Sequence, residues 1–469
     1  MKIRQKAICM ALLSLLMSIT SCKDFLDVSP RNQVENDKMF GNPQSAEAAV
    51  LGIYGGLSSA NYLGLRYPLF ADLAADNLAW SGTFTTFNEI DNASIQPSNG
   101  EVTAMWAAIY ADINAANNVI ERVATTPGLP KNLARQYVAE ARALRAFNYF
   151  NLVRYWGGVP LILQPTKSQE PISVLSVPRS TVDDVYNQVQ LDLDSAQVSL
   201  PNTSSVTRIN KWAVLGLKAR LALYRRNWPV AAAHCDSILK NLAYTLEPNY
   251  RNLFESGLTK ESIWEVDFTE TNPSQYAFFM FPNSFGGRLE VTPNGSTGNL
   301  ATASTNGTSF EARTDRRYAA TLSQNFQLNG LAVPSNTVVK YDDPGNGNDN
   351  YIILRLGEII LTAAEAKAEL GRVSEALAHL NTIRARAGLT ARTTTSQSLL
   401  LTQIERERRV ELALEGHRWF DLKRRNRVQT VLGPLVPNLS LSRDRELFPI
   451  PARELTNNTA LAGNQNPGY

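Results

Sequence analysis

Two alanine-rich stretches of this chain align without gaps, and they constrain its fold more than any other feature. Residues 217–239 and 362–384 match at an offset of 145 positions, which pairs Ala219 with Ala364. In each stretch, an alanine on a first helix is followed twelve residues later by an alanine on a second helix, across a short turn. Small residues at such positions let antiparallel helices pack closely, as in tetratricopeptide repeats. The alignment therefore predicts stacked helix pairs.

Helical periodicity recurs outside these two stretches. Apolar residues return every three or four positions across 134–156, with Arg145 off that stripe, and Gly157 should end the helix. A helix at 102–123 precedes it and should form an antiparallel pair with it, and a further helix is expected at 181–198. About four pairs result, enough for a superhelix. The predicted fold class is mainly α, with tetratricopeptide-like helix pairs forming a curved superhelical core.

Three long stretches lack this periodicity. Residues 61–100 and 268–350 are rich in Gly, Asn, Ser, Thr and aromatic residues, and 425–469 is rich in Pro and Asn. Irregular segments of this length are uncommon inside compact domains unless they have a function. The first two are therefore predicted to form a loop-rich face that binds a ligand.

The N-terminal residues have the pattern of an export signal. Three basic residues precede the apolar run 7–19, and small residues then lead to Cys22. The run is too short to span a membrane, so residues 1–21 are predicted to be a signal peptide. Without them the chain holds 43 basic and 43 acidic residues. Zero net charge gives no global attraction to nucleic acid or acidic lipid.

Cys22 would be the first residue of the exported chain, with Cys235 as its other cysteine. The spacing leaves a bridge between them open, but there is no disulfide framework. CxxC and HExxH are absent, and there are only three histidines, so neither metal nor cofactor is expected. Bacterial lipoproteins carry their lipid on the thiol of a cysteine at this position. Lipidation of Cys22 is therefore predicted, and the alternative is ordinary cleavage that leaves a free thiol.

Six stretches, in order along the chain, resemble the RagB/SusD family of outer-membrane nutrient-uptake lipoproteins: 21–30, 142–162, 353–371, 376–389, 404–424 and 447–469. The resemblance implies a single SusD-like domain over 22–469, with a helical core and an irregular ligand-binding face. It also implies a SusC-like TonB-dependent outer-membrane barrel as partner, over which the lipoprotein sits as a lid. Lys23 and Asp24 resemble the charged signal that sends such lipoproteins to the cell exterior.

The stretch 70–87 holds the best candidate ligand contacts. Sugar rings present apolar faces that stack on aromatic planes, and hydroxyls that need polar partners. Trp80, Phe84 and Phe87, beside Asp76 and Asn77, suit such a ligand. Glycan-binding members of the family use residues of the corresponding loop. The alternative is that Trp80 packs the loop onto the core and Asp76 caps a turn.

A second aromatic stretch, 276–288, adds further candidates. If it is extended, alternate side chains point in opposite directions, so about half of its aromatic rings should be core. Tyr276, Phe279 and Arg288 are proposed as ligand contacts.

Two charged stretches are interpreted as structural. Residues 341–351 are rich in oxygen ligands but fail the EF-hand pattern, which favours a tight polar loop over a calcium site. The charges of 404–424 are expected to form an ion-pair network along one helix, with His417 packed beside Trp419.

The sequence offers little support for catalysis. It has no GxSxG elbow, P-loop or dinucleotide fingerprint, and no carboxylate pair stands out for glycoside hydrolysis. Together with the resemblance, which implies the barrel partner, this predicts a non-enzymatic function: capture of an oligosaccharide or polysaccharide at the cell surface and its delivery to the barrel. The alternatives are the same role for peptides or another nutrient, a secreted glycosidase, and a helical-repeat scaffold without a small ligand.

Overall fold

The computed structural model describes residues 39–166, 176–203, 205–255, 257–293, 300, 310–311, 314–440 and 442–469. The predicted signal peptide and Cys22 lie outside the described residues. The first half of the chain contains helices α2 (Pro43–Leu57), α3 (Arg66–Leu73), α4 (Thr85–Asp91), α5 (Gly100–Arg122), α6 (Lys131–Trp156), α8 (Val182–Ser199), α9 (Lys211–Tyr224) and α10 (Trp228–Leu239), and the 3₁₀ turn η2 (Val123–Thr125).

The second half contains helices α11 (Asn252–Glu255), α12 (Tyr276–Met280), α13 (Arg316–Thr321), α14 (Leu356–Glu369), α15 (Val373–Arg386), α16 (Gln397–Glu411), α17 (Arg418–Arg424), α18 (Val428–Leu432), α19 (Pro437–Ser440) and α20 (Ala452–Asn457). Its 3₁₀ turns are η3 (Asn283–Phe285), η4 (Asp444–Glu446) and η5 (Thr459–Leu461). The strands of the chain are β1 (Ala79–Trp80), β2 (Ser262–Val266), β3 (Val291–Thr292), β4 (Gln327–Leu328), β5 (Leu331–Ala332) and β6 (Tyr351–Arg355).

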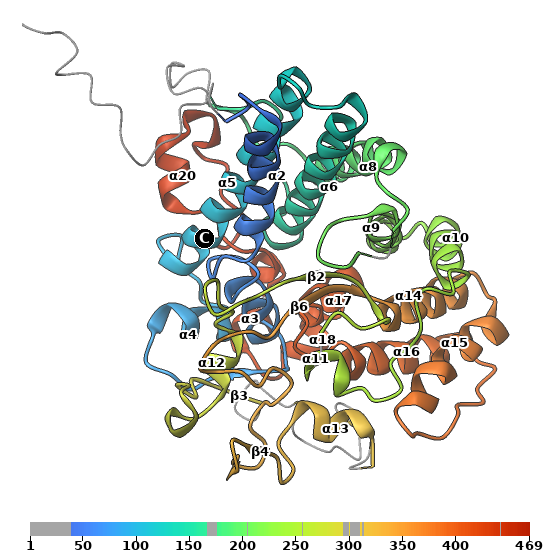
Figure 1. The fold of residues 1–469 in the computed structure, drawn as a ribbon. Helices are drawn as coiled ribbons and strands as arrows, with labels where there is room; N and C mark the ends of the chain where they lie inside the picture. The colour runs from blue at the N-terminus through green and yellow to red at the C-terminus, as the bar shows by residue number, and fades with distance from the viewer. Residues whose placement is uncertain are drawn as a thin grey trace, which may run out of the picture.

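The long helices pack in sequence order into a curved array (Figure 1). Helix α5 packs on α6, α6 on α8, α8 on α9, α9 on α10 and α10 on α14, which in turn contacts both α15 and α16. Each long helix therefore packs against the next long helix along the chain, as in a helical-repeat protein, although a long irregular segment separates α10 from α14. The prediction of a mainly α fold with tetratricopeptide-like pairs is confirmed.

The two aligned stretches form equivalent helix pairs. Helices α9 and α14 both end, and α10 and α15 both begin, at positions 145 residues apart. The four alanines that the alignment pairs are fully buried (Ala219, Ala231, Ala364 and Ala376). The equivalent turn residues Arg226 and Gly371 both have positive φ, 55° and 75°. A residue in this left-handed conformation commonly ends a helix. Glycine adopts the conformation without strain, whereas arginine adopts it at a cost, so the two turns have the same geometry although their residues differ.

Helix α6 lies at the centre of the array and is buried on nearly all sides over its C-terminal half. Arg145, which lies off the apolar stripe, is also buried and pairs through its guanidinium with Asp192 of α8 at 2.7 Å. Gly157 follows the helix with φ of 74°, which ends it where the sequence predicts.

The segments expected to be irregular contain short elements on the other side of the molecule, where Figure 1 places α4, α12, β3 and α13. Residues 61–100 are not mainly loop: they include α3, whose residues from Tyr67 to Leu73 are all buried. The short antiparallel pair of β1 with β3 joins these two segments, and β2 and β6, which flank residues 268–350, pair with each other. The β2–β6 pair is buried throughout and leads directly into α14.

Candidate functional site: an aromatic cluster on the irregular face

Five of the residues proposed from sequence come together from two distant segments. We call Trp80, Phe84, Phe87, Phe279 and Arg288 the aromatic cluster. Strand β1 holds Trp80, α4 holds Phe87, and Phe84 is the N-cap residue just before α4; α12 holds Phe279, and Arg288 lies in the loop before β3. The Trp80 and Phe87 rings stack with centroids 4.7 Å apart and planes at 13°. The Phe279 ring centroid lies 5.8 Å from that of Phe87.

Backbone pairing brings the two segments into register. Trp80 of β1 lies opposite Val291 of β3, and the Ser81 amide donates a hydrogen bond to the Glu290 carbonyl at 2.9 Å. The Trp80 amide donates to the Asp91 carboxylate of α4 at 2.9 Å, which ties the strand to the helix. A Cβ at Gly82 would lie 2.5 Å from the Trp80 ring, so glycine lets the chain pass close beside the indole.

The cluster has a buried base and an open upper surface. Phe87 and Phe279 are buried and Trp80 nearly so, while Phe84 is 41% exposed. The guanidinium of Arg288 lies 4.9 Å from the Phe84 ring centroid and pairs with Glu290. The exposed Leu289 lies between these two charged residues in the chain. An apolar ring face flanked by a cation and a carboxylate can stack on a sugar and bond its hydroxyls.

Two buried polar atoms at this cluster have no hydrogen-bond partner among the described residues: Trp80 Nε1 and Glu290 Oε2. A buried polar group without a partner costs free energy, so each such group needs a reason. An indole N–H can only donate, and a carboxylate can only accept. A hydroxyl both donates and accepts, so it is the kind of ligand group that matches both atoms in chemistry.

Asp76 and Asn77 are not part of this cluster, because both are buried under it. Asp76 accepts hydrogen bonds from Arg418 Nε at 2.7 Å and pairs with Arg409 Nη1 at 3.2 Å. Burial alone would raise the pKa of Asp76, but these two guanidinium groups lower it to about 2. Asn77 accepts from Arg409 and donates to Asp72. Neither side chain is open to a ligand, so both anchor the segment to the core instead.

Tyr276 is also buried away from the surface. Its hydroxyl lies 3.2 Å from Asp72 Oδ2 and donates a hydrogen bond to it. Burial raises the pKa of Asp72 to about 6, although the hydrogen bonds from Asn77 and Tyr276 oppose the shift. Tyr276 therefore packs the α12 segment onto α3 and does not reach the surface with Phe279.

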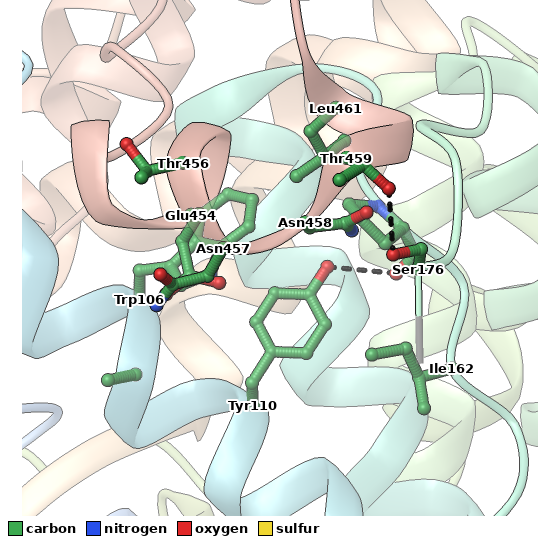
Figure 2. A pocket seen from close by; sticks show the side chains of 12 residues that line it. Trp106, Tyr110, Ile162, Ser176, Glu454, Thr456, Asn457, Asn458, Thr459 and Leu461 are labelled. Atoms are coloured by element: carbon green, nitrogen blue, oxygen red, sulfur yellow. Dashed lines mark hydrogen bonds between the residues drawn. The ribbon is translucent and has the colours of Figure 1, made fainter. Parts of the chain in front are cut away.

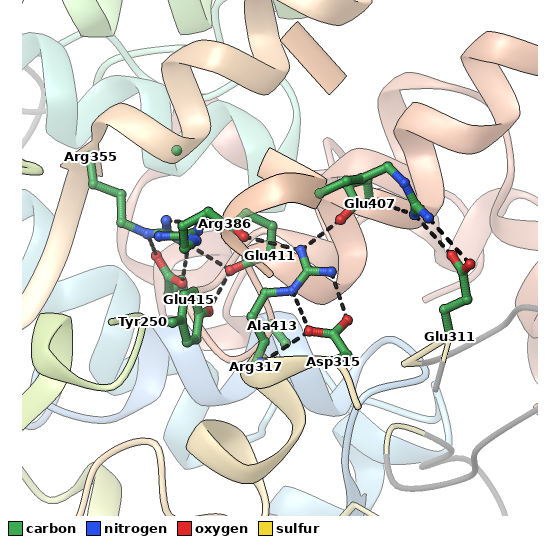
Figure 3. Close-up of polar contacts among 12 residues, drawn as sticks. Tyr250, Glu311, Asp315, Arg317, Arg355, Arg386, Glu407, Glu411, Ala413 and Glu415 are labelled. Carbon is green, nitrogen blue, oxygen red and sulfur yellow. Dashed lines mark hydrogen bonds and ion pairs between the residues drawn. The ribbon is translucent and has the colours of Figure 1, made fainter. Parts of the chain in front are cut away.

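The charges of 404–424 do form a network, but not along one helix. Helix α16 ends at Glu411 and α17 begins at Arg418. Figure 3 shows the partners arriving from distant segments. We call this set the ion-pair network: Glu261, Arg317, Lys340, Arg355, Arg386, Glu411 and Glu415.

Arg355 is at the centre of the ion-pair network. Its Nη1 lies 2.8 Å from Glu261 and 2.5 Å from Glu411, and its Nε lies 2.8 Å from Glu415. Burial alone would raise the pKa of Glu411, but three neighbouring arginines hold it well below its usual range. His417 is buried next to Trp419, as expected, and burial lowers its pKa to about 4. The network is fully internal and suits a structural role.

A cavity of about 660 Å³ lies between α5 and α20 (Figure 2). It was not predicted from the sequence. Trp106 and Tyr110 are among its lining residues, one helical turn apart on α5, but nothing in the sequence pairs them with the C-terminal segment. The Tyr110 hydroxyl donates to the Pro160 carbonyl at 2.8 Å, and Trp106 faces Glu454 closely enough to oppose the rise that burial causes in the pKa of that carboxyl. Because both aromatic polar groups have partners within the chain, we place the candidate site at the aromatic cluster.

The residues 341–351 form a polar loop, as expected. Both Asp343 carboxylate oxygens accept backbone amide hydrogens, from Asn346 at 3.0 Å and Asn348 at 3.2 Å. Asp349 accepts from the Asp343 amide at 2.9 Å. Across the described ranges, no group of three or more His, Cys, Asp or Glu residues is placed to hold a metal ion. In the same ranges, no helix is both long enough and apolar enough to cross a bilayer.

Comparison with known proteins covers almost the whole chain. Residues 254–469 match the family model described as the SusD family, and residues 24–223 match one described as starch-binding associating with outer membrane. A SusD-like protein of Formosa agariphila is 28% identical over 97% of this chain and 98% of its own length.

Solved structures show the same fold. A SusD superfamily protein from Bacteroides vulgatus superimposes with a TM-score of 0.79 at 19% identity, covering 92% of this chain and 100% of its own. A laminarin-binding SusD-like protein superimposes with a TM-score of 0.72 at 24% identity, also over 92% of this chain and 100% of its own. Two family models on different parts of the chain, full-length relatives and the shared fold agree. The chain therefore belongs to the RagB/SusD family.

Proposed function

We propose that this protein captures an oligosaccharide or polysaccharide on the aromatic cluster. The observation that carries this proposal is the exposed Phe84 ring above the stacked Trp80 and Phe87, beside the unpartnered indole N–H of Trp80. Stacking supplies affinity and the polar atoms orient the sugar. The laminarin-binding relative in the same family supports a glycan as the ligand class.

Binding without hydrolysis fits the chemistry of this cluster. Glycoside hydrolysis needs two carboxyl groups on opposite sides of the scissile bond. Glu290 supplies one carboxylate next to the cluster, and it pairs with Arg288. In the segment that holds Trp80 and Phe87, Asp76 and Asp91 are buried and tied to other groups, and Glu89 accepts hydrogen bonds from the Gln96 amide and the Asn99 side chain. We therefore propose a non-enzymatic role.

Delivery completes the proposed role. Residues 22–469 act as one domain, anchored in the outer membrane by a lipid on Cys22 and facing the cell exterior. The captured glycan passes to a SusC-like TonB-dependent barrel. The family model whose description names outer-membrane association supports this location. Labelling with a palmitate analogue in cells, lost in the Cys22→Ala variant, tests the anchor. Co-purification of a TonB-dependent barrel with the wild-type protein tests the partnership.

Isothermal titration of the leaderless Cys22→Ala protein against a panel of neutral oligosaccharides, laminarin oligosaccharides among them, tests the binding role. At least one glycan should bind with micromolar to millimolar Kd. Phe84→Ala should weaken that affinity about tenfold, or about 1.4 kcal/mol, because the sugar loses its exposed stacking ring. Leu399→Ala is the matched control: Leu399 is 48% exposed but lies on α16, and its removal should change nothing.

The other outcomes separate the alternatives. If the titration gives binding heat with peptides and none with glycans, the protein takes up a peptide instead of a glycan in the same role. Release of reducing ends from the panel would mean a glycosidase. Equal binding by the wild type and Phe84→Ala would move the site away from the aromatic cluster.

A further inference from the structure

A cavity of about 220 Å³ opens between α6, α8, α9 and α17, and its lining has one sign of charge. Among the described residues that line it, three are basic (Arg154, Lys423 and Arg424), two carry phenol hydroxyls (Tyr186 and Tyr224), and none is acidic. Val182, which is 41% exposed, lies at its rim, so the cavity reaches the surface. Buried cations are normally paired with acids, which makes this composition unusual.

Arg154 has no carboxylate partner among the described residues. Its guanidinium lies 4.4 Å from the ring centroids of both Phe150 and Phe420. Its hydrogen bonds go to neutral oxygens: the Phe150 carbonyl, the Tyr224 and Tyr67 hydroxyls and the Asn151 amide. Burial raises the pKa of Tyr67 to about 12, so this phenol stays neutral. The two aromatic rings favour the Arg154 cation, but nothing described here neutralises it.

Lys423 brings a second positive charge to the same cavity. Its ammonium group donates to the Arg154 backbone carbonyl at 2.5 Å, and no ion pair of Lys423 is found in the described part of the chain. Burial lowers the pKa of Lys423 to about 7, with Glu446 opposing this shift and Arg154 adding to it. An ammonium has three donors, so further donors remain for a ligand.

Arg424, next to Lys423 on α17, is by contrast a cation with full acidic compensation. Its guanidinium binds Glu365 through both Nη atoms, at 2.5 and 2.7 Å, and donates from Nε to Asp421 at 2.8 Å. The aromatic sandwich accounts for the burial of Arg154 alone. It does not account for Lys423 beside it: without an acid, burial and the Arg154 charge disfavour the ammonium form of Lys423, and an anion in the cavity would favour that form.

We propose that this cavity binds a small oxyanion, of the size of phosphate, sulfate or a sugar carboxylate. Arg154 Nη1 and Lys423 Nζ supply charge-assisted hydrogen bonds to it, and the hydroxyls of Tyr186 and Tyr224 supply neutral ones. Arg154 Nη1 makes only a 3.4 Å contact with Tyr224, which an anion can replace. This site is separate from the aromatic cluster, since no residue is shared between them.

Isothermal titration at constant ionic strength, balanced with sodium chloride, tests the site. The probes are inorganic phosphate, inorganic sulfate and glucuronate, with glucose as the uncharged control. At least one anion should bind saturably with a Kd below about 10 mM. Lys423→Met should weaken it at least tenfold, whereas Lys211→Met, at an exposed lysine, should not. If Lys423→Met does not fold, Tyr186→Phe tests the site instead. This variant removes one hydroxyl and keeps the ring, so it should weaken binding about threefold.

The probes also identify the source of the anion. Binding of phosphate or sulfate assigns the site to a free oxyanion, and binding of glucuronate alone assigns it to an acidic group carried by a sugar. Absence of saturable heat with all three anions overturns the proposal. Anion binding that both Lys423→Met and Tyr186→Phe leave unchanged also overturns it.

Discussion

The ion-pair network and the aromatic cluster are both assembled from distant segments. They differ in whether groups remain exposed or without a partner. In the network, Arg355 and Glu411 are at most 1% exposed, and their charged groups pair with one another. In the cluster, Phe84 is 41% exposed, and Trp80 Nε1 has no hydrogen-bond partner in the part of the chain that the structure describes. A closed set of interactions stabilises the fold, whereas an open one keeps free energy available for a ligand. Changes in the first should therefore affect stability, and changes in the second should affect binding.

The largest effect is expected where the network loses its shared carboxylate. Glu411→Gln leaves Arg355, Arg386 and Arg317 short of negative charge in the core. Removing one partner from a buried ion pair costs about 3–5 kcal/mol of unfolding free energy. Urea denaturation followed by circular dichroism measures this. Glu375→Gln, at an exposed pair with Arg372, should leave the midpoint unchanged. A small loss in Glu411→Gln would mean that the network does not hold the core.

An acid-dependent effect of intermediate size is expected at Asp76. Its folded-state pKa of about 2 is below the ordinary aspartate pKa of 3.8, so Asp76 stabilises the fold above pH 4. This contribution, about 2 kcal/mol, is lost as the pH falls from 4 toward 2. In Asp76→Asn, the unfolding free energy should be lower at pH 7 and should fall less between pH 4 and 2. Parallel pH curves for the variant and the wild type would contradict the ion-pair role given to Asp76.

The smallest effect is expected at the unpartnered indole. Trp80→Phe keeps a stacking ring but removes the N–H, so glycan affinity should fall about threefold to tenfold, on the order of 1 kcal/mol. Trp106→Phe is the matched control, because the Trp106 indole faces Glu454 outside the cluster. Titration calorimetry compares the two variants. If Trp80→Phe binds as tightly as the wild type, the N–H of Trp80 does not contact the ligand.

The candidate site was predictable in part. Aromatic residues grouped in two stretches indicated a surface for stacking, and the structure joins five of the eight proposed residues. Asp76 and Asn77 were misplaced because their partner Arg409 lies more than 330 residues further along the chain. Glu290 was missed although it stands two residues after Arg288. Which side of a short segment faces the core depends on such distant partners, and no local pattern records them.

The division between features set by local sequence and features set by distant contacts applies to the whole molecule. The sequence by itself determined the helix pairs, because periodicity, small residues and turn residues act over a few positions. It also determined the family, since the six characteristic stretches keep their order along the chain. Only the tertiary structure decided that the charged segment 404–424 is a core network, that Asp76 is an anchor and that no acid lines the cavity at Arg154 within the described ranges. These features depend on burial and on contacts between remote segments, which set the free energy of each charge.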